Sequence, residues 1–536
     1  MDDDKRQSAA EVEKVASMID TLNITEEKGE SQHRKSLEKA ILAFEEAAAT
    51  LLERGTNVIK LLPAENVFQN KDFASLYLAQ TTTFELGRVG RLLNKNAIQG
   101  IVDLVVMAGD KTLFGVEDLL ERFKSPIEKI VQRIMREGQK ETILWKVAEE
   151  CYHQAVSSAG ELNPDDYHAT CKGVKCADKK EDWIRFWIRS LCNCPDGPTL
   201  FQPQQYSVSE DSVTKPPKRM PRYLFRTYDK HSMGLNTDKI IASLLCQRDE
   251  AGRHKVDILS MDPQEASEML HHHLNKGRYS TFQTRNIVSW SSSLMFVIQY
   301  ANYRFCNPEF GPPGEIHICA VDTSKFPRGQ FARDKWLLDW FSSAKFSDDE
   351  IRFRDLRFKR PEFNNGEYLS QGKLHIEGRS CTLSVQGLAN AGLWDLSPDF
   401  NVDDAEPTDP VRKDWAKYVK YLRQEWLVTG KTTKAGVQCA LNIAQECFPD
   451  FDQDDMALLL LSFRERKLHP EEPSFQDPFA DLLSPVSVEG VVYQEPVEVV
   501  RYSKLRKRLS KLSQASGQRG MKLFEQLYVL EDADED

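Results

Sequence analysis

The sequence lacks an apolar run long enough to cross a membrane. Its best candidate, Ile101–Gly109, is far shorter than the ~20 residues that a spanning helix needs, and Asp103 interrupts it. The first residues, Met1–Lys5, are dominated by aspartate and have none of the apolar character of a secretory signal. We therefore expect an intracellular protein, cytoplasmic by default.

Cysteine is scarce, and positive charge is in deficit. Eleven cysteines among 536 residues are too few, and odd in number, for a disulfide framework. A formal net charge of −11 argues against non-specific nucleic-acid binding by the whole chain, although it leaves room for a local basic patch. Four cysteines cluster near His168, namely Cys171, Cys176, Cys192 and Cys194. The spacing of these four is not that of a zinc ribbon, so free thiols are favoured over a metal site.

The composition that is present, 40% apolar and 29% charged, is typical of a soluble protein with several domains. Residues 1–200 are predicted to be helical. After Ser36, apolar residues recur at helical spacing through Leu37, Ile41, Phe44 and Leu51. Similar patterns predict four further helices, at 113–124, 126–136, 141–156 and 182–192.

Two stretches of linker composition divide the chain. Residues 201–220 are rich in proline, serine and glutamine, and residues 391–410 are acidic and contain proline. Between them, residues 221–390 mix strand and helix patterns. The predicted fold class is therefore a multidomain chain with an N-terminal α-helical domain, a central α+β domain and a small C-terminal helical region.

The C-terminal part is predicted to hold a helical segment at 411–467 and a largely irregular tail at 468–536. Within the tail, residues 503–512 read as a basic helix. Its patch Lys504–Lys511 is favoured as a solvated face that pairs with the acidic terminus Glu531–Asp536. The alternatives are a nuclear-import signal, which would add the nucleus to the expected locations, and contact with an anionic surface.

The most informative segment is Asn286–Ala301, which begins as a strand and continues as a helix. Strand alternation turns Ser289 and Ser291 to one face. The second half has helical spacing, and Ser292 or Ser293 is suited to cap the helix. A strand that presents hydroxyl groups and runs into a helix is a common frame for a small-molecule site, although it is also common in ordinary packing.

Two other strands carry charged residues. The predicted strand Arg222–Tyr228 places Arg226 among apolar and aromatic side chains, where it needs an anionic partner or a full set of acceptors. Another strand is predicted at Glu315–Asp322. The last, Gly366–Ile376, turns at Gln371 and Gly372 and has Glu367 at its mouth.

Arginine, serine and glutamate on successive strands, in this order, resemble the toxin-type ADP-ribosyltransferases and fungal relatives of that domain. The matching motifs are Leu224–Asp229, Ile287–Ser291 and Gly366–Ile376, and His271–Arg285 is similar to the histidine-containing lead-in of several toxin branches. The resemblance covers about residues 221–385. It implies an α+β domain with a split β-sheet and NAD as the substrate.

The resemblance also implies roles for individual residues. These enzymes cleave the bond between nicotinamide and ribose, and a carboxylate on the ribose 2-hydroxyl stabilises the positive charge that develops. Glu367 is that carboxylate, Arg226 holds the NAD diphosphate, and Ser289 supports the glutamate or the ribose. The implied site residues are, in catalysis, Glu367 and Ser289 and, in NAD binding, Arg226, Ser291, Phe296, Tyr300 and His273; no metal is implied.

Alternatives remain at this stage. Arg226 can instead pair with a structural carboxylate such as Asp229 or Asp322. Asn365 stands where arginine-modifying members carry glutamine or glutamate, which argues against arginine as the acceptor. The predicted function is therefore transfer of ADP-ribose to an unknown protein or small molecule, or hydrolysis of NAD. The alternatives are a catalytically inactive interaction module of the same fold, or a scaffold in which the motif match is accidental.

Overall fold

The computed structural model divides the chain into two compact units, residues 1–95 and 96–536. In the first unit, the described positions are helical, as predicted, and the apolar stripe after Ser36 lies outside them. The described residues are scattered positions between 35 and 57, then 91, 94–137, 142–165, 176–202, 220–248, 253–275, 286–305, 313–401, 415–469, 487–488, 491–492 and 494–531.

The second unit begins with a group of helices. Their shared core is aromatic, because Trp183, Phe186 and Trp187 are all fully buried. The indole nitrogen of Trp183 donates to the carbonyl of Leu162 at 3.0 Å, which satisfies the one polar atom of this side chain. The four predicted helices are confirmed as α3 (Val116–Arg122), α4 (Lys124–Glu137), α5 (Ile143–Val156) and α7 (Cys176–Asn193).

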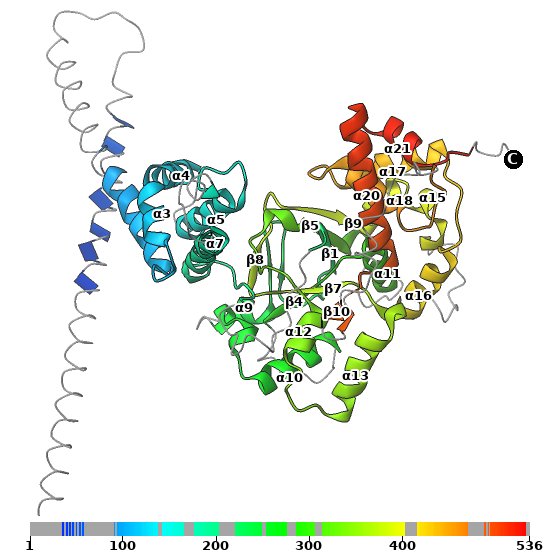
Figure 1. Ribbon diagram of the computed structural model, residues 1–536, viewed down its shortest axis with the longest axis horizontal. Coiled ribbons are helices and arrows are strands. Elements are labelled where there is room, and N and C mark those ends of the chain that lie inside the picture. The colour runs from blue at the N-terminus through cyan, green and yellow to red at the C-terminus, as the bar shows by residue number, and fades with distance from the viewer. Residues whose placement is uncertain are drawn as a thin grey trace, which may run out of the picture. The chain divides into compact units, whose positions relative to one another are not determined.

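A six-stranded antiparallel sheet forms the centre of the second unit, with the strand order β6-β7-β4-β1-β5-β9 (Figure 1). The strands predicted around Arg226, Ser289 and Glu367 are β1, β4 and β7, and they are neighbours in this order. A smaller sheet has the order β2-β3-β8. The large sheet comprises β1 (Tyr223–Tyr228), β4 (Ile287–Ser291), β5 (His317–Asp322), β6 (Ala332–Arg333), β7 (Glu367–Gln371) and β9 (Ser380–Ser384). The small sheet comprises β2 (Leu235–Asn236), β3 (Ile240–Ala242) and β8 (Lys373–His375).

The large sheet separates between β1 and β4. These two strands pair at one register position, where Phe225 faces Ser291. In contrast, β1 pairs with β5 from Tyr223 to Tyr228, and β4 pairs with β7 along its whole length. The backbones of β1 and β4 therefore diverge beyond Phe225. Arg226, the next residue, lies where the gap opens.

The turn predicted at Gln371 and Gly372 is confirmed, and it moves the chain from one sheet to the other. Gly372 has a φ of +60°, and a Cβ there would come 2.8 Å from the hydroxyl of Thr199, so this position requires glycine. Gln371 consequently ends β7 in the large sheet, while Lys373 begins β8 in the small one.

Helices that lie between the strands in sequence, and others that follow the last strand of the large sheet, complete the unit. The helix α11 (Leu294–Phe305) packs on β1, and the C-terminal helices join the same core, as Figure 1 shows for the yellow to red segments. These are α16 (Trp415–Glu425), α17 (Lys434–Cys447), α18 (Gln453–Leu461), α20 (Val497–Ser516) and α21 (Met521–Leu527). Ile287 of β4 and Leu369 of β7 share a second core with α10 (Pro263–Leu274), α12 (Asp334–Trp340) and α13 (Asp348–Lys359).

Two C-terminal expectations differ from the structure. The start of the predicted acidic linker is packed, because α15 (Leu393–Leu396) precedes Phe400, which is 1% exposed. The predicted basic helix at 503–512 is the middle of α20, which is longer because its buried face, Tyr502, Leu505 and Leu509, belongs to the main core. Residues 203–219 and 402–410 of the predicted linkers lie outside the described residues.

Candidate functional site

Ser289 joins the three predicted motifs. Its hydroxyl donates to Glu367 Oε1 on β7 at 2.9 Å, and its backbone carbonyl accepts from the Arg226 guanidinium at 3.1 Å. A third predicted residue, His273, places its Nε2 2.8 Å from the same hydroxyl. Arg226, His273, Ser289 and Glu367 are all half-buried. The structure therefore brings four of the predicted site residues into one hydrogen-bonded group.

Local sequence explains why these side chains meet. In α10, the Asp262 carboxylate accepts from the backbone of Gln264 and Glu265 and starts the helix, so that His273 falls in the last turn. After β4, the hydroxyl of Ser293 accepts from the Phe296 amide at 3.0 Å, which confirms one of the two predicted caps and starts α11. The sheet register then sets Ser291 opposite Glu367, two residues along the strand from Ser289.

The direction of the hydrogen bonds limits the chemistry of Ser289. A serine hydroxyl has one proton, and here it points to a Glu367 oxygen. When Glu367 is ionised, His273 must therefore donate its Nε2 proton to Ser289. This polarity is opposite to that of a serine nucleophile, whose hydroxyl donates to an acceptor nitrogen of histidine. The arrangement orients the carboxylate of Glu367 and does not activate Ser289.

The second oxygen of Glu367 pairs with Arg357 of α13 at 2.7 Å. The same guanidinium contacts Asp334 at 3.2 Å. Burial lowers the pKa of Arg357, but the charges of Glu367 and Asp334 outweigh burial and raise the pKa above its usual value. Arg357 is thus a fixed cation that restrains Glu367 from the side opposite Ser289.

Arg226 is a half-buried cation that forms no ion pair with any described carboxylate. Its side chain donates to Asn236 of β2 at 3.3 Å and to the Ser289 carbonyl. The two structural partners considered from sequence are engaged elsewhere, since Asp229 pairs with Arg304 and Asp322 pairs with Arg222. Burial lowers the pKa of Arg226 to about 10. Because a buried charge without a counter-ion is costly, the position favours an anion.

The other predicted residues lie apart from this group. Ser291 donates to the carbonyl of Asn365 at 2.6 Å and so ties β4 to the loop before Glu367. Phe296 and Tyr300 stack on each other, and both contact the ring of Trp415 in α16. Their contacts are those of helix packing, with ring centroids 5.4 and 5.6 Å from that of Trp415.

Sequence reasoning missed Arg357, Asp334 and Asn236. The capping box formed by Ser347 and Glu350 is a readable signal for the start of α13. No sequence pattern, however, indicates that a helix preceding β7 would turn an arginine toward Glu367. These partners come from elements outside the three motifs, so their placement depends on the tertiary fold.

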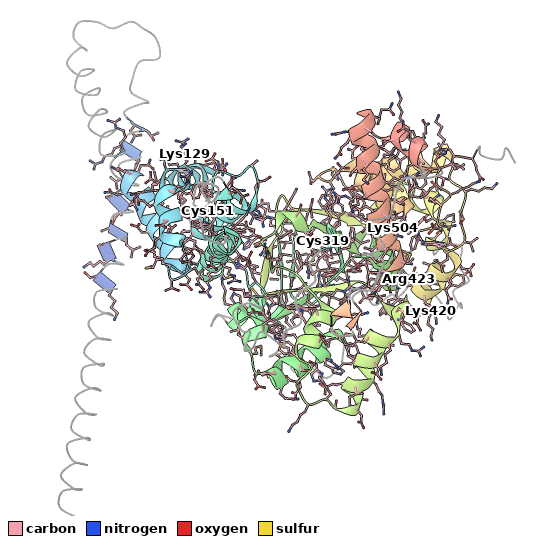
Figure 2. The ribbon with its side chains drawn as sticks, viewed as in Figure 1. Lys129, Cys151, Cys319, Lys420, Arg423 and Lys504 are labelled. Carbon is pink, nitrogen blue, oxygen red and sulfur yellow. The ribbon has the colours of Figure 1, made fainter. Side chains whose placement is uncertain are left out.

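Neither of two prominent surface pockets contains Arg226, Ser289 or Glu367. One, of about 830 Å³, lies between the end of α7 and residues 255–260, and the other, of about 600 Å³, lies between β9 and α17. We base the candidate site on the hydrogen-bonded group, because pocket size alone does not bring reactive groups together. Cys319 of β5, labelled in Figure 2, is not a candidate reactive thiol, because burial raises its pKa to about 12.

The cysteine cluster shows no metal site within the described residues. Cys192 accepts from the side-chain amide of Gln202 at 3.2 Å, and burial raises its pKa to about 12 and that of Cys194 to about 11. Cys171 and His168 lie outside the described residues. Among the helices that the structure describes, none is both long and apolar enough to cross a membrane.

Asp257, on the wall of the larger pocket, gives a prediction about pH. Burial raises its pKa from 3.8 to about 6. Hydrogen bonds from the Gln371 side chain and the Gln202 backbone amide act in the opposite direction but do not cancel the effect of burial. The folded protein therefore holds this proton more tightly than the unfolded chain does, and the associated stability is lost as pH rises from about 4 through about 6. A shift of ~2 pKa units corresponds to about 3 kcal/mol.

We expect Asp257→Asn to remove this titration. Denaturant unfolding of both proteins from pH ~4 to pH ~7 should show a difference in unfolding free energy that changes by about 3 kcal/mol across the range. The variant should gain relative to the wild type as pH rises. Parallel pH curves for the two proteins would contradict the assignment of a raised pKa to Asp257.

Comparison with known families places the site in one matched region. The family model described as "Domain of unknown function (DUF7587)" matches residues 219–377. This region contains Arg226, His273, Ser289, Arg357 and Glu367. No curated protein and no solved structure was found to match the chain. The match also ends before the C-terminal helices that share the core of the sheet.

Proposed function

We propose that the matched region is an ADP-ribosyltransferase-like domain that cleaves NAD, either as a transferase or as an NAD glycohydrolase. The observation that carries the proposal is the connected group of Arg226, Ser289 and Glu367 at the point where β1 and β4 separate. Arginine, serine and glutamate on neighbouring strands are the elements that the sequence motifs led us to expect. The separation of the sheet is consistent with the split sheet of that fold.

Arg226 is suited to the diphosphate of NAD. It is the one member of the group whose charge has no described carboxylate partner, and a guanidinium can form two parallel hydrogen bonds to phosphate oxygens. Asn236 and the Ser289 carbonyl hold its side chain at the gap in the sheet. Binding of a diphosphate there would supply the counter-ion that burial of Arg226 calls for.

Glu367 is suited to the ribose next to nicotinamide. As the bond between ribose C1 and the nicotinamide nitrogen breaks, its electron pair leaves with nicotinamide and positive charge develops on the ribose. A carboxylate that accepts a hydrogen bond from the 2-hydroxyl stabilises this charge. Water or an acceptor then bonds to C1 and releases a proton. Ser289 and Arg357 hold one carboxylate oxygen each, which limits the orientations of Glu367.

A specific observation favours a second candidate, an inactive interaction module of the same fold. Arg357 pairs with Glu367 Oε2 and already neutralises part of the charge of this carboxylate. A glutamate with a purely structural role would have the same kind of partner. In the first candidate, this pair orients a working residue. In the second candidate, the pair only stabilises the fold, and Glu367 contacts no substrate.

The test is release of nicotinamide from NAD by the purified full chain, measured together with NAD binding by calorimetry. The first candidate predicts binding and release that both depend on the residues named above. Binding without release would indicate that the domain needs an acceptor or activator. Absence of both would reject NAD as the substrate and support the interaction module.

A further inference from the structure

A short C-terminal segment, Gln494–Glu498, lies against the ends of the two strands that carry Ser289 and Glu367. We call this segment the strap. It leads into α20, the long red helix in Figure 1, and its contacts are with the turn after β4, the start of β7 and the strand β6. The strap is more than a hundred residues beyond the end of the matched region at residue 377.

Glu495 is the centre of the strap. Its carboxylate accepts from the hydroxyl of Ser292 at 2.6 Å and from the hydroxyl of Tyr368 at 2.7 Å, and it pairs with Arg333. The Arg333 side chain is 1% exposed and also lies beside Asp334. Glu495 thus binds to three separate elements, namely the turn after β4, the second residue of β7 and the end of β6.

The neighbouring residues of the strap hold the loop that precedes Glu367. The Gln494 carbonyl accepts from Arg333 at 3.0 Å and from the side-chain amide of Asn364. Pro496 packs on Gly366, where an added Cβ would come 3.0 Å from the proline and closer still to the Ser292 hydroxyl. Gly366 has a φ of +63°, so the close approach and the backbone conformation both require glycine.

A second anchor keeps the strap in register with the site. Glu498, with a side chain 3% exposed, pairs with Arg423 at 2.8 Å and accepts from the hydroxyl of Ser293. Figure 2 shows Arg423 of α16 beside the first turn of α20, with Lys504 farther along the same helix. Ser292 and Ser293, the two residues that link β4 to α11, are therefore held by Glu495 and Glu498 of the strap.

We propose that Glu495 is a positioning residue for the candidate site, and that the C-terminal strap is part of the working domain. Glu495 bridges the turn after β4 and the start of β7, and so supports the distance between these strand ends from outside the backbone ladder. That distance determines whether the Ser289 hydroxyl reaches Glu367, since Ser291 faces Glu367 in the register and Ser292 donates its amide to the Gly366 carbonyl at 2.8 Å. The inference deepens the proposed function and rests on it for the catalytic readout only.

The kinetic test uses Glu495→Gln in the full chain. This change keeps the shape of the side chain and removes its charge. Arg333 then loses its ion pair with Glu495 and keeps only the one with Asp334, which weakens the hold of the strap on the loop at Asn364–Gly366. We expect kcat for nicotinamide release to fall about 100-fold, because a displacement of ~1 Å at a catalytic group has an effect of this size, and KM for NAD to stay within about twofold. Glu495→Asp keeps the charge and should recover part of the loss.

The matched control is Glu149→Gln. Glu149 of α5 forms a similarly buried pair with Arg379, 2.8 Å from one guanidinium nitrogen, and touches no residue of the site. This variant loses a buried ion pair by the same substitution. It should lower stability and leave kcat and KM unchanged. An equal loss of kcat in both variants would show that general destabilisation, and not positioning, is responsible.

A readout that does not depend on catalysis is the nitrogen NMR signal of His273, identified by its absence in His273→Gln. In the wild type, we expect the tautomer with the proton on Nε2, hydrogen-bonded to Ser289. Glu495→Gln should shift this signal, and Glu149→Gln should not. If the wild type neither binds NAD nor releases nicotinamide but the His273 signal responds, the proposed function fails and the positioning role stands. An unchanged His273 signal in a folded Glu495→Gln protein overturns the positioning role.

Discussion

Glu367→Gln is expected to lower the rate of nicotinamide release by about 10²–10³-fold while NAD still binds. The substitution preserves the size and shape of the side chain but removes the charge that opposes the positive charge on the ribose. The amide oxygen can still accept from Ser289, and Arg357 keeps its ion pair with Asp334 when it loses the one with Glu367, so the fold should be retained. Steady-state kinetics and NAD titration of the same preparations give kcat and affinity separately.

Glu362→Gln is the control for this experiment. Glu362 lies in the same connection between α13 and β7, five residues before Glu367, and its side chain pairs with the exposed Arg360 at 3.3 Å. The control loses a carboxylate of the same loop and should keep full activity. If both variants are as active as the wild type, Glu367 is not the catalytic carboxylate, and the mechanism proposed for this site is wrong.

Arg226→Gln is expected to weaken NAD binding by about 30- to 1000-fold, which corresponds to ~2–4 kcal/mol for a charged hydrogen-bonded contact. The same change should leave the stability of the NAD-free protein unchanged or higher. Arg226 has no described ion pair to lose, and burial lowers its pKa to about 10. Its charge therefore destabilises the NAD-free protein. Binding and stability are expected to move in different directions.

Arg222→Gln, at the residue just before β1, provides the opposite result. Arg222 contacts Asp322 at 3.4 Å and pairs with Asp455, so its loss leaves two buried carboxylates with fewer partners. Thermal unfolding should therefore show a lower melting temperature for this variant, while calorimetry shows normal NAD affinity. Equal NAD affinity in the Arg226 variant and the wild type would remove Arg226 from the binding site.

Much of the central domain was predictable because its signals are local. Strand alternation identified the segments that became β1, β4, β5 and β7, and the change of period after Ser291 identified α11. The serine cap at Ser293 and the turn at Gly372 were predicted from residue type alone, since few residues suit those backbone positions. The role in NAD binding implied for Phe296 and Tyr300 remains a prediction, although both rings contact Trp415.

The C-terminal part was predicted less well, for a physical reason. Its helices have apolar faces with no partner nearby in sequence, and acidic, proline-rich stretches separate them from the sheet. Composition therefore suggested a linker and a tail. Phe400 and the apolar face of α20 gave only a weak sequence pattern, and they are buried because they pack in the main core.

The resemblance singled out the arginine, serine and glutamate of the three motifs. By itself, the sequence determined the segments that became β1, β4, α11 and β7. It did so because periodicity and residue preference are properties of neighbouring residues. Only the tertiary structure decided that Arg226 has no carboxylate partner among the described residues, that Arg357 faces Glu367, and that Glu495 joins the turn after β4 to the start of β7. These contacts link residues from separate elements, up to two hundred positions apart, and depend on how the sheet separates and which helices cover it.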